Sequence, residues 1–173
     1  ETYNPYNEKP ETIIIAEQRV PAYLNPGGPI TDDGELPEYK HGDKYVPYKV
    51  VAHFKGTDLE GLHYEQLMPW IKPCEKVGEY SAKFVNDYAE AHPEKVFKGE
   101  DGVDTFVEMA DQAFRVILGD YVTTEDGTGI VHIAPTFGAD DANVARAAGI
   151  PSLFMINKRG ETRPMVDLTG KFY

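Results

Sequence analysis

The sequence predicts an α+β fold, a β-barrel-like core with a few short helices. Short β-branched and aromatic runs separated by Gly- and Pro-rich breaks predict strands, and these outnumber the helical patterns by about two to one. The length of 173 residues is typical of one domain with its own core, so residues 1–173 are expected to form a single domain.

The first third of the chain contains two predicted strands separated by a loop. The β-branched run Ile13–Ile15 predicts a buried strand, and the pattern turns helical after Ala16. Residues 25–43 hold four Gly and three Pro and predict an extended loop. Residues 45–54 (YVPYKVVAHF) predict the second strand, with Pro47 at an edge position or a bulge.

Two helices are predicted later in the chain. In residues 78–92, aromatic and apolar side chains recur every three or four positions, and His92-Pro93 ends the pattern. Residues 140–149 carry four alanines, an N-cap at Asp140 or Asp141, and a glycine at the C-terminal end. Both segments therefore have helical start and stop signals.

Further strands are predicted in the last third of the chain. Three apolar runs are typical of strands. The first, 112–122, precedes a turn at 125–129. The second, 129–135, is ended by Pro135, and the third, 153–157, follows the second predicted helix.

The charge is strongly negative, with 17 Lys and Arg against 29 Asp and Glu and a net charge of −12. Proteins that bind nucleic acid through its phosphates gather positive charge, so stand-alone binding of this kind is excluded. Residues 85–126 hold eleven acids and three bases, which is −8 of the −12. We expect an acidic insertion around 72–111, and we expect the acidic stretch 85–126 to be solvated and to face away from any nucleic acid.

Composition also indicates the compartment. The single cysteine, Cys74, excludes an intramolecular disulfide and is compatible with a reducing environment. No apolar run approaches the roughly 18 residues that a membrane span needs. The sequence therefore predicts a cytoplasmic protein without membrane contact. Because residue 1 is Glu and the last residues are still patterned, the chain is expected to be a piece of a longer protein.

Residues 127–141 (GTGIVHIAPTFGADD) are the candidate functional segment, because they combine a predicted strand, a loop and a helix start. His132 alternates with apolar neighbours, so it faces either a pocket or solvent. One of Asp140 and Asp141 suffices to cap the helix. The second carboxylate is suited to binding a substrate ammonium group.

Other candidate sites are weaker. His53 and His63 lack a matching set of ligands, so no metal site is expected. Cys74 lies in no paired motif and is not expected to be a nucleophile. The GTG at 127–129 lacks the third glycine of a phosphate-binding loop, because His132 stands there.

The 127–141 segment and the terminal RPMVDLTGKF resemble the editing domain (connective peptide 1) of isoleucyl-tRNA synthetases. LEGLHYEQLMPW resembles the earlier L-x-G-x-x-Y-x-x-L segment of that family. The resemblance implies hydrolysis of mischarged valyl-tRNA(Ile). A binding site distinguishes two amino acids that differ by one methylene by only about 1–3 kcal/mol, and isoleucine against valine is the standard example of this limit. A second, hydrolytic site is therefore needed.

The resemblance also implies residue roles. Asp141 matches the aspartate that holds the aminoacyl ammonium, His132 the histidine beside the substrate, and Phe137 a residue near the terminal adenosine. The substrate-binding set adds Gly138, Gly129 and Thr128. A positioned water attacks the ester, helped by the terminal ribose hydroxyl, so no protein nucleophile is expected.

The implied partners are the 3′ end of aminoacylated tRNA(Ile) and the remainder of the synthetase chain. No metal or other cofactor is expected in this domain, since ATP is used by the synthetic domain of the parent enzyme. Ala139 replaces the usual acidic residue before the two aspartates, and the family's threonine-rich segment is missing. The isolated fragment is therefore expected to be weakly active or inactive.

Two alternatives remain open. The first is the editing domain of a valyl- or leucyl-tRNA synthetase, although the histidine of VHIAP favours the isoleucine type, because the valine type generally has lysine there. The second is a non-catalytic β-barrel interaction module, in which Asp140 and Asp141 only cap a helix.

Overall fold

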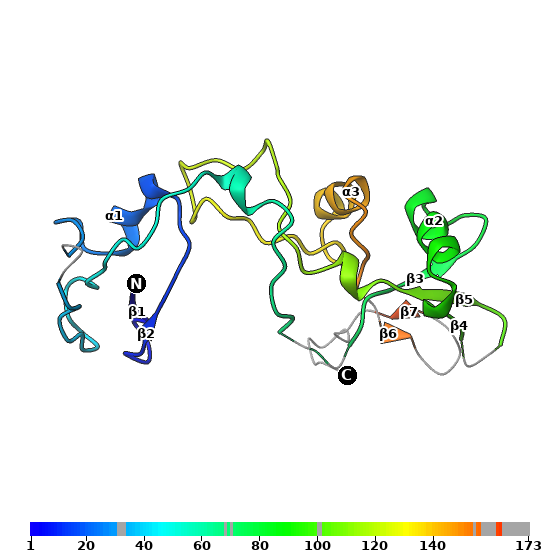
Figure 1. The fold of residues 1–173 in the computed structure, drawn as a ribbon, viewed down its shortest axis with the longest axis horizontal. Coiled ribbons are helices and arrows are strands. Elements are labelled where there is room, and N and C mark those ends of the chain that lie inside the picture. Colours follow the sequence, from blue (N-terminus) through cyan, green and yellow to red (C-terminus); the bar gives the residue numbers. More distant parts are fainter. Residues whose placement is uncertain are drawn as a thin grey trace. The chain divides into compact units, whose positions relative to one another are not determined.

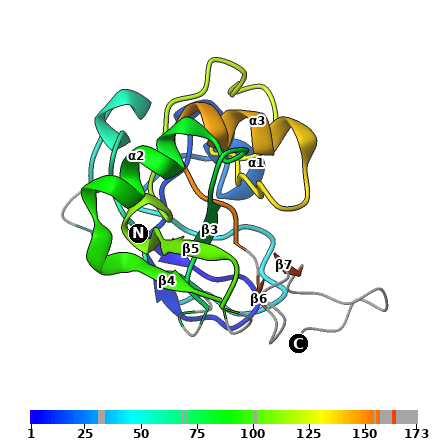
Figure 2. The ribbon, with the colours of Figure 1, turned by 90° about the vertical axis from the view of Figure 1, so that its right-hand side faces the viewer.

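The structure is a computed structural model that describes residues 1–30, 34–67, 69, 71–99, 102–153, 155–156 and 162–163. Within this part the chain is α+β, as predicted, with short antiparallel strands and three α-helices (Figures 1 and 2). It divides into two compact units. Unit 1 comprises Glu1–Asp58 and Leu118–His132, and unit 2 comprises Leu59–Ile117 and Ile133–Tyr173.

Unit 1 starts with a two-stranded ladder of β1 (Thr2–Tyr3) and β2 (Pro10–Glu11), in which Thr2 pairs with Glu11. A short 3-10 helix, Glu17–Arg19, leads into α1 (Val20–Tyr23). The predicted change to helix after Ala16 is therefore confirmed. Pro21 lies in the first turn of α1, where its missing N–H costs no hydrogen bond.

The buried residues of unit 1 form a small set. Tyr39 is buried and its ring stacks on Tyr3, with the ring centroids 6.0 Å apart. Thr2 is 2% exposed, and its hydroxyl donates to the Pro47 carbonyl over 2.9 Å. The other buried apolar side chain of this unit among the described residues is Leu24.

Unit 2 has a three-stranded antiparallel sheet in the order β3-β5-β4. The strands are β3 (Cys74–Val77), β4 (Val96–Lys98) and β5 (Thr105–Glu108). Val107 of the central strand pairs with Glu75 on one side and with Val96 on the other. Phe106 and Val107 are both fully buried, so β5 forms the middle of the core.

Helix α2 (Lys83–Ala91) packs its apolar side against this sheet (Figure 1). Val85 and Ala89, one turn apart, form the buried cluster with Val107 and Met109. The helix predicted within 78–92 is confirmed, and it ends directly before His92 as the His-Pro signal indicated.

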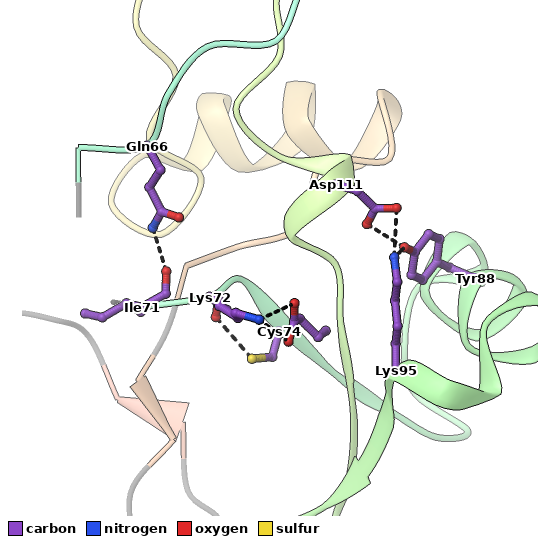
Figure 3. Close-up of polar contacts among 8 residues, drawn as sticks. Gln66, Ile71, Lys72, Cys74, Tyr88, Lys95 and Asp111 are labelled. Atoms are coloured by element: carbon purple, nitrogen blue, oxygen red, sulfur yellow. Dashed lines mark hydrogen bonds and ion pairs between the residues drawn. The ribbon is translucent and has the colours of Figure 1, made fainter. Parts of the chain in front are cut away.

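A polar cluster joins the end of α2 to the chain after β5 (Figure 3). The Lys95 ammonium donates to the Asp111 carboxylate over 2.8 Å and also bonds the Tyr88 hydroxyl, which itself donates to Asp111. Burial alone would raise the pKa of Asp111, but these hydrogen bonds and the charge of Lys95 lower that pKa to about 2. The cluster is charged at neutral pH, and its hydrogen bonds attach the C-terminal end of α2 to the chain after β5.

The second predicted helix is α3 (Ala139–Ala147). Its N-cap is Gly138, so the expected cap at Asp140 or Asp141 is wrong. Both aspartates instead lie in the first turn, where a negative charge complements the helix dipole. Gly149 adopts φ +68° just past the helix, as the C-terminal signal indicated.

The strand expected at 153–157 is confirmed in part, as β6 (Met155–Ile156), which pairs with β7 (Thr162–Arg163). Residues 154 and 157 lie outside the described residues.

Four predicted strands are wrong. The segments 13–15, 45–54, 112–122 and 129–135 form no ladder in the described structure. Their backbone hydrogen bonds are too few for a ladder. Ile30 N–H donates to the Tyr48 carbonyl over 2.8 Å, and residues 112–122 make one bridge, between Arg115 and His63, beside which Val116 N–H donates to the Leu62 carbonyl over 2.8 Å. Strand propensity therefore gives extended chain here that pairs over too few residues to form a ladder.

The three-stranded sheet instead lies in the acidic stretch around 72–111. Two ion pairs lie along it, with Lys76 2.7 Å from Asp104 and Lys72 3.0 Å from Glu108. The sheets do not close into a barrel over the described residues. No described helix is long and apolar enough to cross a membrane.

Truncating Met109 to Ala is expected to lower the free energy of unfolding by about 2–5 kcal/mol, because the side chain is 1% exposed and a cavity would remain. Urea unfolding followed by circular dichroism measures this loss. The matched control is Val103→Ala at a 74% exposed position, where the change should stay within about 0.5 kcal/mol. Equal losses in both variants would contradict a core at Met109.

Candidate functional site

The boundary between the units lies inside the candidate segment, between His132 and Ile133. Thr128, Gly129 and His132 belong to unit 1, whereas Phe137, Gly138 and Asp141 belong to unit 2.

In unit 1 the predicted turn at 125–129 is held by the segment that leads into α1. Ala16 N–H donates to the Thr128 carbonyl over 2.9 Å. The Arg19 guanidinium donates to the carbonyls of Gly127 and Glu125 over 2.8 and 2.9 Å. Three carbonyls of one turn are therefore bound by two residues more than a hundred positions earlier in the chain.

Gly129 is the most constrained residue of this turn. Its φ is +77°, a left-handed conformation that residues with a Cβ rarely adopt. A Cβ added here would lie 2.5 Å from the Cβ of Ala16. Next to it, the Thr128 hydroxyl donates to the Ile130 carbonyl over 3.2 Å. Thr128 and Gly129 thus both have structural roles within unit 1.

His132 and Phe137 are exposed, Phe137 to 66%. For His132 the sequence left a pocket or solvent as the two possibilities, and the side chain is accessible to solvent.

In unit 2 the loop before α3 is closed by Asp141, whose Oδ2 accepts a hydrogen bond from Ala134 N–H over 2.9 Å. Phe137 N–H and Gly138 N–H both donate to the Ala134 carbonyl, over 2.9 and 3.2 Å. A Cβ at Gly138 would lie 3.0 Å from Asp141 Oδ2. The structure therefore brings Gly138 and Asp141 together, with a partly buried carboxylate at the start of a helix.

Thr136 attaches this loop to the chain after α3. Its hydroxyl donates to the Leu153 carbonyl over 3.1 Å and accepts from Leu153 N–H over 3.3 Å. The sequence analysis did not identify Thr136, because its partner is 17 residues away and no local pattern indicates it.

The site chemistry favours charge recognition over covalent catalysis. Asp141 offers a fixed anion for a cationic group. Cys74 is a poor nucleophile, because burial and the neighbouring Glu108 and Glu75 carboxylates raise the pKa of its thiol to about 11. The thiol donates to the Lys72 carbonyl over 3.1 Å (Figure 3). Over the described residues, no three His, Cys, Asp or Glu side chains gather as metal ligands would.

Comparison with known proteins identifies relatives along the whole chain. Over 173 residues, all of this chain, it is 56% identical to the isoleucine–tRNA ligase of Bacteroides thetaiotaomicron and 50% identical to that of Bacteroides fragilis. The chain is homologous to a segment of the isoleucine–tRNA ligases. The ligase of Porphyromonas gingivalis is 42% identical over 174 aligned residues. The chain spans 12% of the length of each of these three ligases.

No family model matches this ligase segment, and no solved structure matches it. The matches support the isoleucine type over the valine and leucine types that the sequence had left open.

Replacing Gly129 with Ala is expected to destabilise unit 1, because the new methyl adds an overpacking cost of about 1–3 kcal/mol to the left-handed strain. Amide hydrogen exchange at Ala16 should accelerate, since its hydrogen bond to Thr128 weakens. Gly127→Ala is the matched control, because Gly127 has φ +55° with open space around its Cα. This control should lose only the roughly 1 kcal/mol of stability that the left-handed strain costs. Equal exchange rates of the Ala16 amide in the two variants would contradict the contact between Gly129 and Ala16.

Proposed function

We propose that this chain is the editing domain of an isoleucine–tRNA ligase, where it hydrolyses mischarged valyl-tRNA(Ile). The observation that carries the proposal is the Asp141 carboxylate, partly buried at the start of α3 and oriented by Ala134 N–H. Asp141 Oδ2 is occupied by that bond, and the carboxylate keeps its charge and further acceptor capacity. It is suited to binding the α-ammonium of an aminoacyl ester.

The reaction proposed is attack of a positioned water on the ester carbonyl, helped by the terminal ribose hydroxyl. The protonated state of Cys74 supports a mechanism without a protein nucleophile. The family resemblance assigns substrate contacts to His132 and Phe137, both of which are exposed.

The partners proposed are the tRNA 3′ end and the rest of the ligase chain. Unit 1 leaves apolar side chains exposed by about half, among them Ile14, Val51 and Val131. These lie in segments with strand propensity that form no ladder. Neighbouring ligase segments would pair with them and complete the barrel-like core. ATP-dependent ligation would take place elsewhere in the same cytoplasmic enzyme.

A non-catalytic interaction module is the second candidate. The Asp141 bond to Ala134 N–H favours it, because this contact gives the carboxylate a structural role without any substrate. The two functions differ in whether the charge of Asp141 matters beyond this hydrogen bond.

Substituting Asp141 with Asn in the full-length ligase is expected to slow deacylation of Val-tRNA(Ile) about 10- to 100-fold, because a charged hydrogen bond contributes about 1.5–3 kcal/mol. Asn retains an acceptor for Ala134 N–H, so the melting temperature should hardly change. Asp140→Asn, at the exposed neighbour, is the control and should edit at the wild-type rate. Wild-type editing by the Asp141→Asn enzyme would leave the interaction module as the better explanation.

The isolated chain is expected to bind tRNA weakly, with a Kd above about 100 μM at physiological salt, because its net charge is −12. Fluorescence anisotropy at several salt concentrations measures both the affinity and its salt slope. Tight binding with a steep slope would show that a local basic surface outweighs the overall charge.

A further inference from the structure

The turn at 125–129 contains an aspartate that is directly followed by a glycine, Asp126-Gly127. Both residues are exposed in unit 1. In such a pair the backbone nitrogen of the glycine can attack the side-chain carboxyl of the aspartate, because glycine has no Cβ to shield its nitrogen. Every other described aspartate precedes a residue with a Cβ. Among the described residues, Asp126 is therefore the aspartate best suited to this reaction.

The two groups that would react already face each other. Gly127 N–H donates to Asp126 Oδ1 over 3.0 Å, so the carboxyl group is turned toward the attacking nitrogen. Apart from its two chain neighbours, no atom lies within 4 Å of the position that a Gly127 Cβ would take. Over the described residues the Asp126 carboxylate makes no ion pair. The turn therefore leaves room for a ring between the side chain and the backbone.

Arg19 holds the backbone on both sides of this pair. Its Nε donates to the Gly127 carbonyl over 2.8 Å, and its Nη1 donates to the Glu125 carbonyl over 2.9 Å. The Asp126-Gly127 peptide bond lies between these two carbonyls. Because the guanidinium is planar and rigid, the two hydrogen bonds fix the spacing of the carbonyls. Ring closure rotates the backbone of Asp126 between them, so Arg19 opposes it.

We propose that Asp126-Gly127 is a site of spontaneous aspartate isomerisation and that Arg19 slows the reaction. The Gly127 nitrogen forms a bond to Cγ of the protonated Asp126 carboxyl. The bond from Cγ to the hydroxyl breaks, and the hydroxyl leaves as water with the proton of the nitrogen. The product is a five-membered succinimide ring.

Water then opens the succinimide ring at one of its two carbonyl carbons. Attack at Cγ restores aspartate, whereas attack at the main-chain carbonyl carbon of Asp126 gives isoaspartate, in which the chain runs through Cβ and Cγ. One water is lost and one is gained, and nothing is oxidised or reduced. Both residues are exposed, so solvent supplies this water.

Isoaspartate changes the turn because it adds one carbon to the main chain between the carbonyls of Glu125 and Gly127. The Arg19 guanidinium fits the present spacing of these carbonyls and would lose at least one of its two bonds. Thr128 follows directly, and its carbonyl accepts the hydrogen bond from Ala16 N–H. The modification therefore loosens the attachment of this turn to the segment before α1. It does not depend on the proposed editing activity.

The experiment incubates the full-length ligase at physiological temperature in water enriched in heavy oxygen. After digestion with trypsin in ordinary water, mass spectrometry with electron-transfer fragmentation distinguishes isoaspartate from aspartate. Residue 126 falls in the tryptic peptide 116–146, and the other two Asp-Gly pairs of the sequence, at 33–34 and 101–102, fall in the peptides 20–40 and 99–115. Heavy oxygen and isoaspartate should both accumulate at residue 126 with time.

Two variants test the proposed chemistry. Arg19→Gln removes the guanidinium and should accelerate the reaction at residue 126 about tenfold, because the backbone is free to rotate. Asp126→Glu keeps the carboxylate but requires a six-membered ring, which closes more slowly, so the signal in peptide 116–146 should disappear. Lys9→Gln is the matched control, because it removes an exposed cation of unit 1 and should react at the wild-type rate.

The 101–102 pair is an internal control for the fold and should react at the wild-type rate in Arg19→Gln. The proposal is overturned if residue 126 acquires no isoaspartate in either the wild type or Arg19→Gln. It is also overturned if Arg19→Gln reacts no faster than Lys9→Gln, or if the pairs at 101–102 and 126–127 accelerate alike, since general unfolding would then explain the change. Persistence of the signal in Asp126→Glu would assign it to another aspartate and overturn the proposal as well.

Discussion

The contact of α2 with the centre of the small sheet is the interaction on which unit 2 depends. Three strands of three or four residues are too short to be stable alone, and the burial of Val85 and Ala89 on Val107 and Met109 gives them a core. The same contact fixes β3, and with it the Glu75 carboxylate that binds Ser152 N–H. Through this bond the chain after α3 is attached to the sheet.

Both helices could be predicted because their signals are local. The apolar repeat through 78–92 marks one helix, and the stop signals at His92 and Gly149 lie directly after the ends of the two helices. Strands need partners, which the sequence of one segment does not contain. Ile13–Ile15 has high β propensity but no ladder, whereas β5 was missed because Asp104 and Glu108 flank its buried pair, Phe106 and Val107. These acids are compatible with a strand because Lys76 and Lys72 pair with them.

The candidate site was predictable to a similar degree. Two adjacent aspartates at a helix start indicated that one carboxylate is not needed as a cap and has another role. That carboxylate is Asp141, which accepts a hydrogen bond from Ala134 N–H. That Gly138 is the cap, and that Thr136 binds Leu153, follows from tertiary packing. The hydrogen bond from Ser152 N–H to Glu75 was missed for the same reason, because the two residues are 77 positions apart.

The Arg19 contacts have a consequence for the order of folding. Arg19 binds carbonyls 106 and 108 residues later in the chain, and most of unit 2 is threaded between them. During synthesis, residues 59–117 leave the ribosome before the turn at 125–129 exists. The sheet and α2 can therefore form while unit 1 is still open, and unit 1 closes only after a long loop has been ordered. Such non-local closure is intrinsically slow, so unit 1 closes later than the sheet and α2 of unit 2 form.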